Sequence, residues 1–265
     1  MADKPFQFKK FSVRNTVPGL KVGTDGVLLG AAAHPAWQKG DESGICSADD
    51  STLAVLDIGT GTGVIALMLA QRYPQAHITA IDIDADAAKE AKENFAGSPW
   101  ADRLSALHCS LENYTDVLTT VSHQERGNPA KYDLIVSNPP YYDNSLSAGT
   151  QQRNLARHTV AMGYADIVKF ATIHLDAQGT LALILPSQEE TRLRRFAASY
   201  DLSISEITYI KTTTAKATSR IIVHLEHRGA QAPTSCPKIQ AMTIREGNAY
   251  SKEYCALLAD FLISL

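Results

Sequence analysis

Cysteine is scarce in this chain, and the cysteines that are present form no recognisable pair. The 265 residues include four, which are far apart and have neither CxxC spacing nor a paired histidine motif: Cys46, Cys109, Cys236 and Cys255. A disulfide framework or a zinc site needs closer and more regular spacing than this. We therefore expect reduced thiols in a cytoplasmic protein, and no metal site.

Long apolar runs and a strong excess of one charge are also missing. No stretch approaches the roughly 18 apolar residues of a membrane-spanning helix. The first ten residues carry charges with no apolar segment after them, so no secretory signal is predicted either. A net charge of −3 and a pI near 6.2 do not favour a nonspecific nucleic-acid binder, although they are compatible with a local basic face.

The composition that remains is that of an ordinary globular protein. Hydrophobic residues make up 45% of the chain and charged residues 20%, which is enough for one large α/β domain. Residues 41–51 are polar and acidic and predict an exposed loop. We expect residues 1–50 to form an N-terminal arm and residues 51–265 the main domain, with both in one structural unit.

Strand and helix patterns alternate through the main domain. Seven apolar segments predict strands, at residues 53–58, 77–83, 104–109, 132–137, 179–185, 203–210 and 220–226. Helical spacing predicts the main helices at residues 63–73, 86–95, 164–175, 188–200 and 254–265. This alternation indicates a Rossmann-like, doubly wound and mostly parallel seven-stranded sheet. No long helix separates the last two strands, so we expect an antiparallel hairpin at the sheet edge.

A glycine-rich turn follows the first of these strands. Asp57 leads into Gly59, Gly61 and Gly63, and Asp82 ends the next strand 19 residues after the last glycine. Glycines let the backbone approach a ligand closely, and an acidic residue at the second strand can accept hydrogen bonds from ribose hydroxyls. The spacing GxGxG differs from the GxGxxG of dinucleotide sites, so a nucleoside cofactor is favoured and nicotinamide binding is the main alternative.

A second glycine-containing block lies in the N-terminal arm, at residues 21–31. Its Thr24–Asp25 pair offers a hydroxyl to a polar ligand group and a carboxylate to a cationic amine. The same residues are also typical of a helix that begins near Thr24 with Asp25 in its first turn. Both interpretations are compatible with one another.

The fourth predicted strand ends abruptly in Asn138-Pro139-Pro140-Tyr141. The Asn138 side-chain oxygen and the Pro139 carbonyl can accept the two hydrogens of an exocyclic amine and turn its lone pair out of conjugation. The prolines stiffen the turn that aims these acceptors, and Tyr141 can stack on an aromatic ring. The alternative is that this sequence only terminates the strand.

The whole chain resembles the bacterial tRNA adenine-N6 methyltransferases that modify the adenine at nucleotide 37 of valine tRNA. Four blocks of sequence support the resemblance: residues 8–13 leading into 21–31, residues 56–63, residues 133–142 and residues 153–159. Asn-Pro-Pro-Tyr alone is shared with DNA adenine and protein glutamine methyltransferases. The first and last blocks narrow the resemblance to the tRNA family.

The resemblance implies a class I methyltransferase fold, S-adenosylmethionine as cofactor and a tRNA anticodon stem-loop as substrate, bound by a monomer. Catalysis is expected at Asn138, Pro139, Pro140 and Tyr141. The expected cofactor residues are Thr24, Asp25, Asp57, Gly59, Thr60, Gly61, Gly63, Asp82, Ile83, Leu111 and Asn138. The expected substrate residues are Lys9, Lys10, Lys21, Tyr142, Arg153, Arg157 and His158. Ser110 stands where the family often has an acidic residue, which weakens the case for a charged contact to the cofactor adenine.

Two other functions remain open from the residues alone. A protein-(glutamine-N5) methyltransferase acting on release factors would use the same Asn-Pro-Pro-Tyr chemistry, because an amide nitrogen poses the same chemical problem. A noncatalytic RNA-binding module on the same fold would not need the complete set of glycines, Asp82 and residues 138–141. Further basic residues that could hold RNA phosphates are Lys211, Lys216 and Arg220, whereas Arg192, Arg194 and Arg195 are expected on a solvated helix face.

Overall fold

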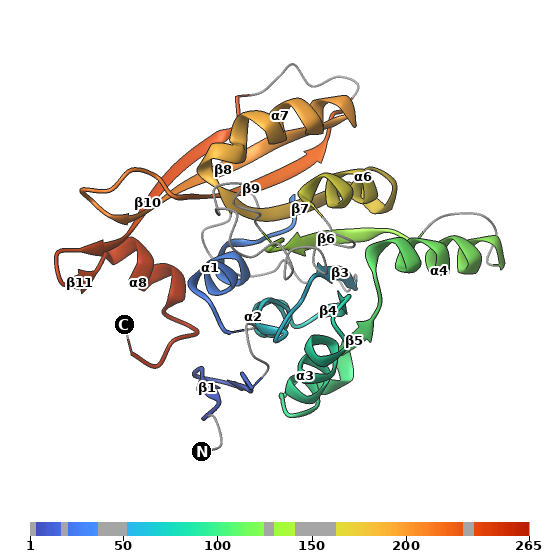
Figure 1. Ribbon diagram of the computed structural model, residues 1–265, viewed down its shortest axis with the longest axis horizontal. Coiled ribbons are helices and arrows are strands. Elements are labelled where there is room, and N and C mark those ends of the chain that lie inside the picture. The colour runs from blue at the N-terminus through green and yellow to red at the C-terminus, as the bar shows by residue number, and fades with distance from the viewer. Residues whose placement is uncertain are drawn as a thin grey trace, which may run out of the picture.

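The computed structural model describes residues 4–16, 21–36, 52–124, 130–140, 163–229 and 236–264. A nine-stranded sheet runs through the molecule in the order β11-β10-β8-β9-β7-β6-β3-β4-β5 (Figure 1). Its strands are β3 (Leu53–Ile58), β4 (Ala76–Asp82), β5 (Leu104–His108), β6 (Tyr132–Ser137), β7 (Leu175–Pro186), β8 (Leu202–Thr213), β9 (Arg220–His227), β10 (Lys238–Glu246) and β11 (Ala249–Tyr250).

The parallel part of the sheet comprises β5, β4, β3, β6 and β7. Strand β9 is antiparallel to both β7 and β8. All seven predicted strands are present, in the doubly wound arrangement that the alternation of strands and helices indicated, and β10 and β11 extend the predicted seven-stranded sheet to nine strands. The predicted antiparallel hairpin is therefore confirmed as a pair, but its position at the sheet edge was wrong: β10 adds to β8 in parallel, and β11 adds to β10.

Helices cover both faces of the sheet (Figure 1). One face packs against α1 (Thr24–Ala32), α2 (Val64–Arg72), α3 (Ala85–Ala96) and α8 (Lys252–Leu258). The other packs against α4 (Leu111–Gln124), α6 (Tyr164–His174) and α7 (Glu190–Ser199). Side chains alternate along β3, so Val55 contributes to the first core and Leu56 to the second. This two-sided burial is why the central strands are continuous apolar runs.

The N-terminal arm packs on the first of these helical layers. Its short hairpin consists of β1 (Phe6–Gln7) and β2 (Ser12–Val13), and Phe8 beyond β1 forms a bridge with Leu262. That bridge and the turn at residues 259–261 end α8 early, so the expected helix over residues 254–265 is shorter than predicted. The proposed boundary at residue 50 lies outside the described residues and stays a prediction.

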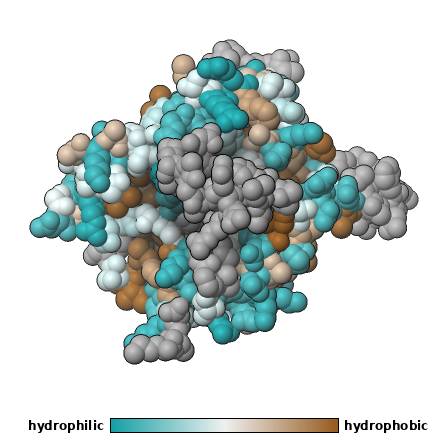
Figure 2. Space-filling model, viewed as in Figure 1, coloured by the Kyte–Doolittle hydropathy of each residue, from teal (hydrophilic) through white to brown (hydrophobic). Residues whose placement is uncertain are grey.

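The described surface has no long apolar helix. Within the described residues, no helix combines the length and the hydropathy that crossing a bilayer requires. Figure 2 shows the molecule from the same side as Figure 1. Polar and charged residues cover most of the described part of the visible surface, with apolar residues interspersed among them. Exposed apolar side chains include Ile239 on β10, which is 66% exposed.

Candidate active site

The candidate site lies where the chain crosses from one face of the sheet to the other. Strand β3 pairs with β4 on one side and with β6 on the other, all parallel, so their carboxyl ends meet at one edge. Ile58 at the end of β3 is level with Ser137 at the end of β6, and the Ser137 hydroxyl donates to the Ile58 carbonyl over 2.7 Å. Ligands of doubly wound sheets bind at such a switch point.

The turn after β3 uses its glycines in two different ways. Gly59, Gly61 and Gly63 all have positive φ values, of 71°, 56° and 81°. A Cβ on Gly59 would meet no atom of the described residues within 4 Å, so the backbone there is open among them. A Cβ on Gly63 would lie 2.5 Å from Cε1 of Phe95, so this glycine allows α2 to pack closely against α3. The first glycine therefore opens the site and the last one supports it.

Asp57 is fully buried beneath this turn. One carboxylate oxygen accepts a hydrogen bond from the Thr60 hydroxyl over 2.6 Å, and the other makes none within the described residues. Burial raises the pKa of Asp57 to about 7, the Thr60 hydrogen bond opposes this rise, and the nearby charge of Asp82 adds to it. The buried carboxyl group thus holds the glycine turn from beneath through Thr60.

Asp82 joins the glycine turn to the end of β4. Its two carboxylate oxygens accept hydrogen bonds from the amides of Gly61, over 2.8 Å, and Asp84, over 2.9 Å. Burial is the main cause that raises its pKa. Each oxygen keeps a further lone pair, so the carboxylate can still accept hydrogen bonds from hydroxyl groups. Asp84 caps α3, as the sequence indicated, by accepting from the amides of Asp86 and Ala87.

The expected catalytic sequence begins directly after β6. Asn138 is half-buried, Pro139 is buried and Pro140 is exposed. The register of β3 and β6 brings Asn138 to the same sheet edge as the glycine turn and Asp82. Tyr141 lies outside the described residues, as do the substrate residues predicted beyond it: Tyr142, Arg153, Arg157 and His158.

The block at residues 21–31 forms α1, which confirms the helical interpretation of its sequence. The helix begins at Thr24 with Gly23 as N-cap, and a Cβ on Gly30 would lie 2.9 Å from the Met68 sulfur of α2. That glycine therefore serves close helix packing. Asp25 forms an ion pair with Arg220 at the start of β9, at 2.9 Å.

A cavity of about 280 Å³ adjoins the Asp25–Arg220 pair, lined by Thr24, Asp25, Leu28, Ile210, Thr212, Ser219, Arg220 and Ile244. The sequence contains no local signal for the Asp25–Arg220 pair, because the two residues are 195 positions apart. Cofactor contacts by Thr24 and Asp25 remain predictions.

The remaining predicted site residues lie either at the sheet edge that carries the glycine turn or in the N-terminal arm. Ile83 follows Asp82 and is 47% exposed, and Leu111 begins α4 with its side chain partly buried. Lys9 instead donates to the Ala259 carbonyl beyond α8, so its ammonium group ties the arm to the C-terminal segment. Lys10 and Lys21 are exposed. A role for these three lysines in RNA binding is still a prediction.

Comparison with known proteins first shows the general class of protein to which this fold belongs. A family model for the methyltransferase small domain matches residues 47–193. The fold is similar to a predicted O-methyltransferase of Agrobacterium tumefaciens, with a TM-score of 0.55 and 18% identity over 89% of this chain and 96% of that one. It is also similar to a Listeria monocytogenes protein described as a class I S-adenosylmethionine-dependent methyltransferase, with a TM-score of 0.54 and 12% identity over 86% and 67%. The molecule thus has a class I methyltransferase fold.

A curated relative narrows this assignment. The tRNA1(Val) (adenine(37)-N6)-methyltransferase of Parabacteroides distasonis is 38% identical over 266 aligned positions, which cover 100% of both chains. The chain belongs to the tRNA1(Val) (adenine(37)-N6)-methyltransferase family.

Proposed function

We propose that the protein methylates N6 of adenine 37 in the anticodon loop of tRNA1(Val), with S-adenosylmethionine as methyl donor. The full-length similarity to a relative named for this reaction is the observation that supports the substrate. The arrangement of Asn138, the glycine turn and Asp82 at one sheet edge supports the chemistry, because a class I site needs a cofactor cradle beside the group that holds the amine.

The residues present fit the cofactor. The open backbone at Gly59 and the spare lone pairs of Asp82 are features that a polar nucleoside with an amino-acid tail requires. We propose that Asp82 accepts hydrogen bonds from the ribose hydroxyls and that the 59–63 turn lies against the amino-acid portion. When bound, S-adenosylmethionine supplies a methyl group activated by a sulfonium centre.

The chain's own contribution is to position the adenine amine. Its lone pair is delocalised into the ring, so the amine is a poor nucleophile until its two hydrogens are held. The Asn138 side-chain oxygen and the Pro139 carbonyl are the two acceptors, and the Pro139–Pro140 sequence restricts the backbone that carries them. Tyr141 stacks on the base, which must leave the loop to enter the site.

The proposal is tested by mapping the product and removing the amide. The purified protein is incubated with isotopically labelled S-adenosylmethionine and tRNA from a strain that lacks the activity, and modified nucleosides are identified by mass spectrometry. N6-methyladenosine is expected. Asn138→Ala should lose most turnover, with a much smaller loss of cofactor affinity in calorimetry, whereas Asn113→Ala, which removes an exposed amide from α4, should keep both. Normal turnover in Asn138→Ala would remove this residue from the mechanism.

A parallel assay separates the substrate from the chemistry. A release factor replaces tRNA in the same reaction, and methylated glutamine is sought by peptide mass spectrometry. We expect none. Label on the release factor and none on tRNA would refute the proposed substrate while leaving the role of Asn138 intact.

A further inference from the structure

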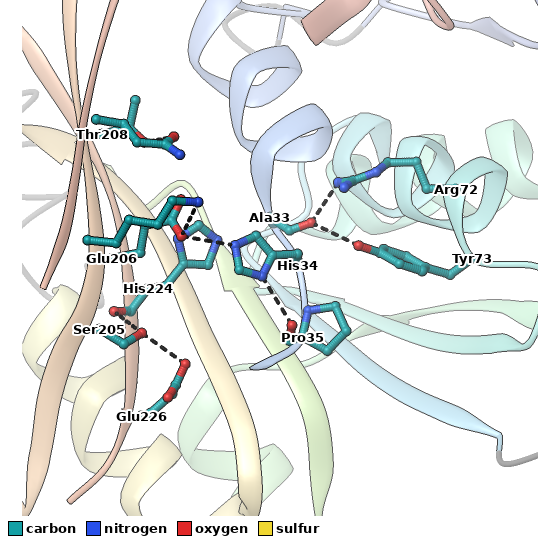
Figure 3. Close-up of polar contacts among 12 residues, drawn as sticks. Ala33, His34, Pro35, Arg72, Tyr73, Ser205, Glu206, Thr208, His224 and Glu226 are labelled. Carbon is teal, nitrogen blue, oxygen red and sulfur yellow. Dashed lines mark hydrogen bonds and ion pairs between the residues drawn. The ribbon is translucent and has the colours of Figure 1, made fainter. Parts of the chain in front are cut away.

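A cluster of metal-ligating side chains lies away from the active-site edge, between the end of α1 and the sheet. His34 follows α1, Glu206 belongs to β8 and His224 to β9, and Glu206 and His224 are direct cross-strand partners. Figure 3 shows the two sheet residues pointing towards the His34 ring. One ligand atom from each of the three side chains lies within 4.8 Å of the others. Three separate elements thus present two imidazoles and a carboxylate to one point.

The cluster is buried and contains a negative charge. Glu206 is 5% exposed and His224 1%, and the His34 side chain is 15% exposed. Oε2 of Glu206 lies 3.6 Å from Nε2 of His34 and 3.4 Å from Nζ of Lys238. That oxygen makes no hydrogen bond within the described part of the chain. A carboxylate at this depth is costly unless cationic partners or a metal ion compensate its charge.

The groups around Glu206 also favour its ionised form. The His34 ring is the largest of the influences that hold the pKa of Glu206 at about 2, and they outweigh the opposing effect of burial. Charges on His224 and Lys238 act in the same direction. The side chain is therefore a carboxylate at neutral pH, which is the form that can bind a cation.

We propose that His34, Glu206 and His224 bind one divalent transition-metal ion of the Zn²⁺ type. Two imidazole nitrogens and one carboxylate oxygen form a donor set that these ions prefer, and water can complete a fourth position. The ion would join the C-terminal end of α1 to β8 and β9. It would thus fix the helix whose other end bears Thr24 and Asp25, although the proposal does not depend on the reaction at the active site.

The side chains must move slightly to bind the ion. Metal–ligand bonds of about 2.0–2.2 Å place tetrahedral ligand atoms roughly 3.4 Å apart, so separations of up to 4.8 Å have to close by as much as about 1.4 Å. The His34 and His224 rings are stacked, with centroids 4.2 Å apart and planes at 21°. A rotation of the less buried His34 ring opens this stack. Lys238 is 59% exposed and has room to withdraw its ammonium group from Glu206.

The competing position of Lys238 provides a sharp test. Metal-free, full-length protein is titrated with ZnCl₂ by calorimetry and with CoCl₂ by absorption spectroscopy, at pH 7.5 and pH 5.5. One ion per chain is expected at pH 7.5, with at least tenfold weaker binding at pH 5.5 because protonated imidazoles cannot ligate. Lys238→Ala should bind more tightly, because it removes a cation that competes for Glu206.

Matched variants identify the ligands. His34→Ala and Glu206→Gln should weaken Zn²⁺ binding at least tenfold and abolish the Zn²⁺-dependent rise in melting temperature. His77→Ala removes an exposed histidine on β4, and Cys236→Ser removes an exposed thiol, and both should bind as the unsubstituted protein does. If Glu206→Gln does not fold, Lys238→Ala and His34→Ala still decide the question. No binding by the unsubstituted protein, or unchanged affinity in His34→Ala, would overturn the proposal.

Discussion

The pKa of Asp57 makes the stability of this fold depend on pH in a direction that is unusual for a carboxylate. Burial raises that pKa from 3.8 to about 7. Between these two values the folded protein retains a proton that the unfolded chain has released, so the free energy of unfolding falls as the pH rises. Most buried carboxylates that are paired with cations have the opposite effect.

The size of the effect follows from the two pKa values. Each pH unit inside the window changes the free energy of unfolding by about 1.4 kcal/mol, so the change from pH 5.5 to pH 7 is roughly 2 kcal/mol. Asp57→Asn removes the titrating group. As the pH rises from 5.5 to 8, the free energy of unfolding of Asp57→Asn should therefore rise by about 2 kcal/mol relative to that of the unsubstituted protein. Any pH-independent difference between the two proteins adds to this change.

The assay is guanidinium unfolding followed by circular dichroism, at several pH values across this range, with both proteins compared at each pH. Taking the difference removes the contributions of other groups, such as the buried His174, whose pKa is lowered mainly by burial. Asp102→Asn, which changes an exposed acid, is the control and should give a constant difference. A difference for Asp57→Asn that stays within about 0.5 kcal/mol would refute the assignment of a raised pKa to this side chain.

Three further substitutions probe the site. Gly63→Ala should lower the free energy of unfolding by about 2–5 kcal/mol, because it places an alanine at a positive φ and a methyl group 2.5 Å from Phe95. Adding Phe95→Leu should recover part of this loss. Full stability of Gly63→Ala in denaturant unfolding would contradict the close contact with Phe95. Asp82→Asn should weaken S-adenosylmethionine binding at least tenfold in calorimetry, and unchanged affinity would remove the ribose contact. Arg220→Ala should lose less than about 1 kcal/mol, since its pair with Asp25 is partly exposed, and should raise KM for tRNA; an unchanged KM would exclude it from RNA binding.

The parts of the fold that depend on local sequence were predictable. Strand β3 and its glycine turn are a continuous apolar run followed by residues that permit positive φ, and both signals lie within about ten residues. Strand β10 was missed although its first four residues, 238–241, alternate polar and apolar side chains. All four are exposed, so the short alternation belongs to no buried face. The same omission caused the hairpin of β8 and β9 to be placed at the edge.

The parts that depend on distant residues were not predictable. Helix α8 ends early because Leu262 pairs with Phe8, which no helical periodicity near residue 262 records. The pair of Asp25 with Arg220 likewise joins opposite ends of the chain.

In the candidate site, the positions of the motifs at the ends of predicted strands correctly indicated that the glycine turn, Asp82 and Asn138 lie at one edge of the sheet. The motifs contained no signal for the cluster of His34 with Glu206 and His224, because these residues are far apart in sequence and come together only through the fold.

The position of the methyl group is the most direct test of the proposed function. A transcript of tRNA1(Val) with adenine at nucleotide 37 and a second transcript with guanine there are incubated with the protein and labelled S-adenosylmethionine. Fragments are then sequenced by mass spectrometry. The proposal predicts one N6-methyladenosine at nucleotide 37 of the first transcript and no label on the second. Equal labelling of both transcripts, or a methyl group at another nucleotide, would contradict it.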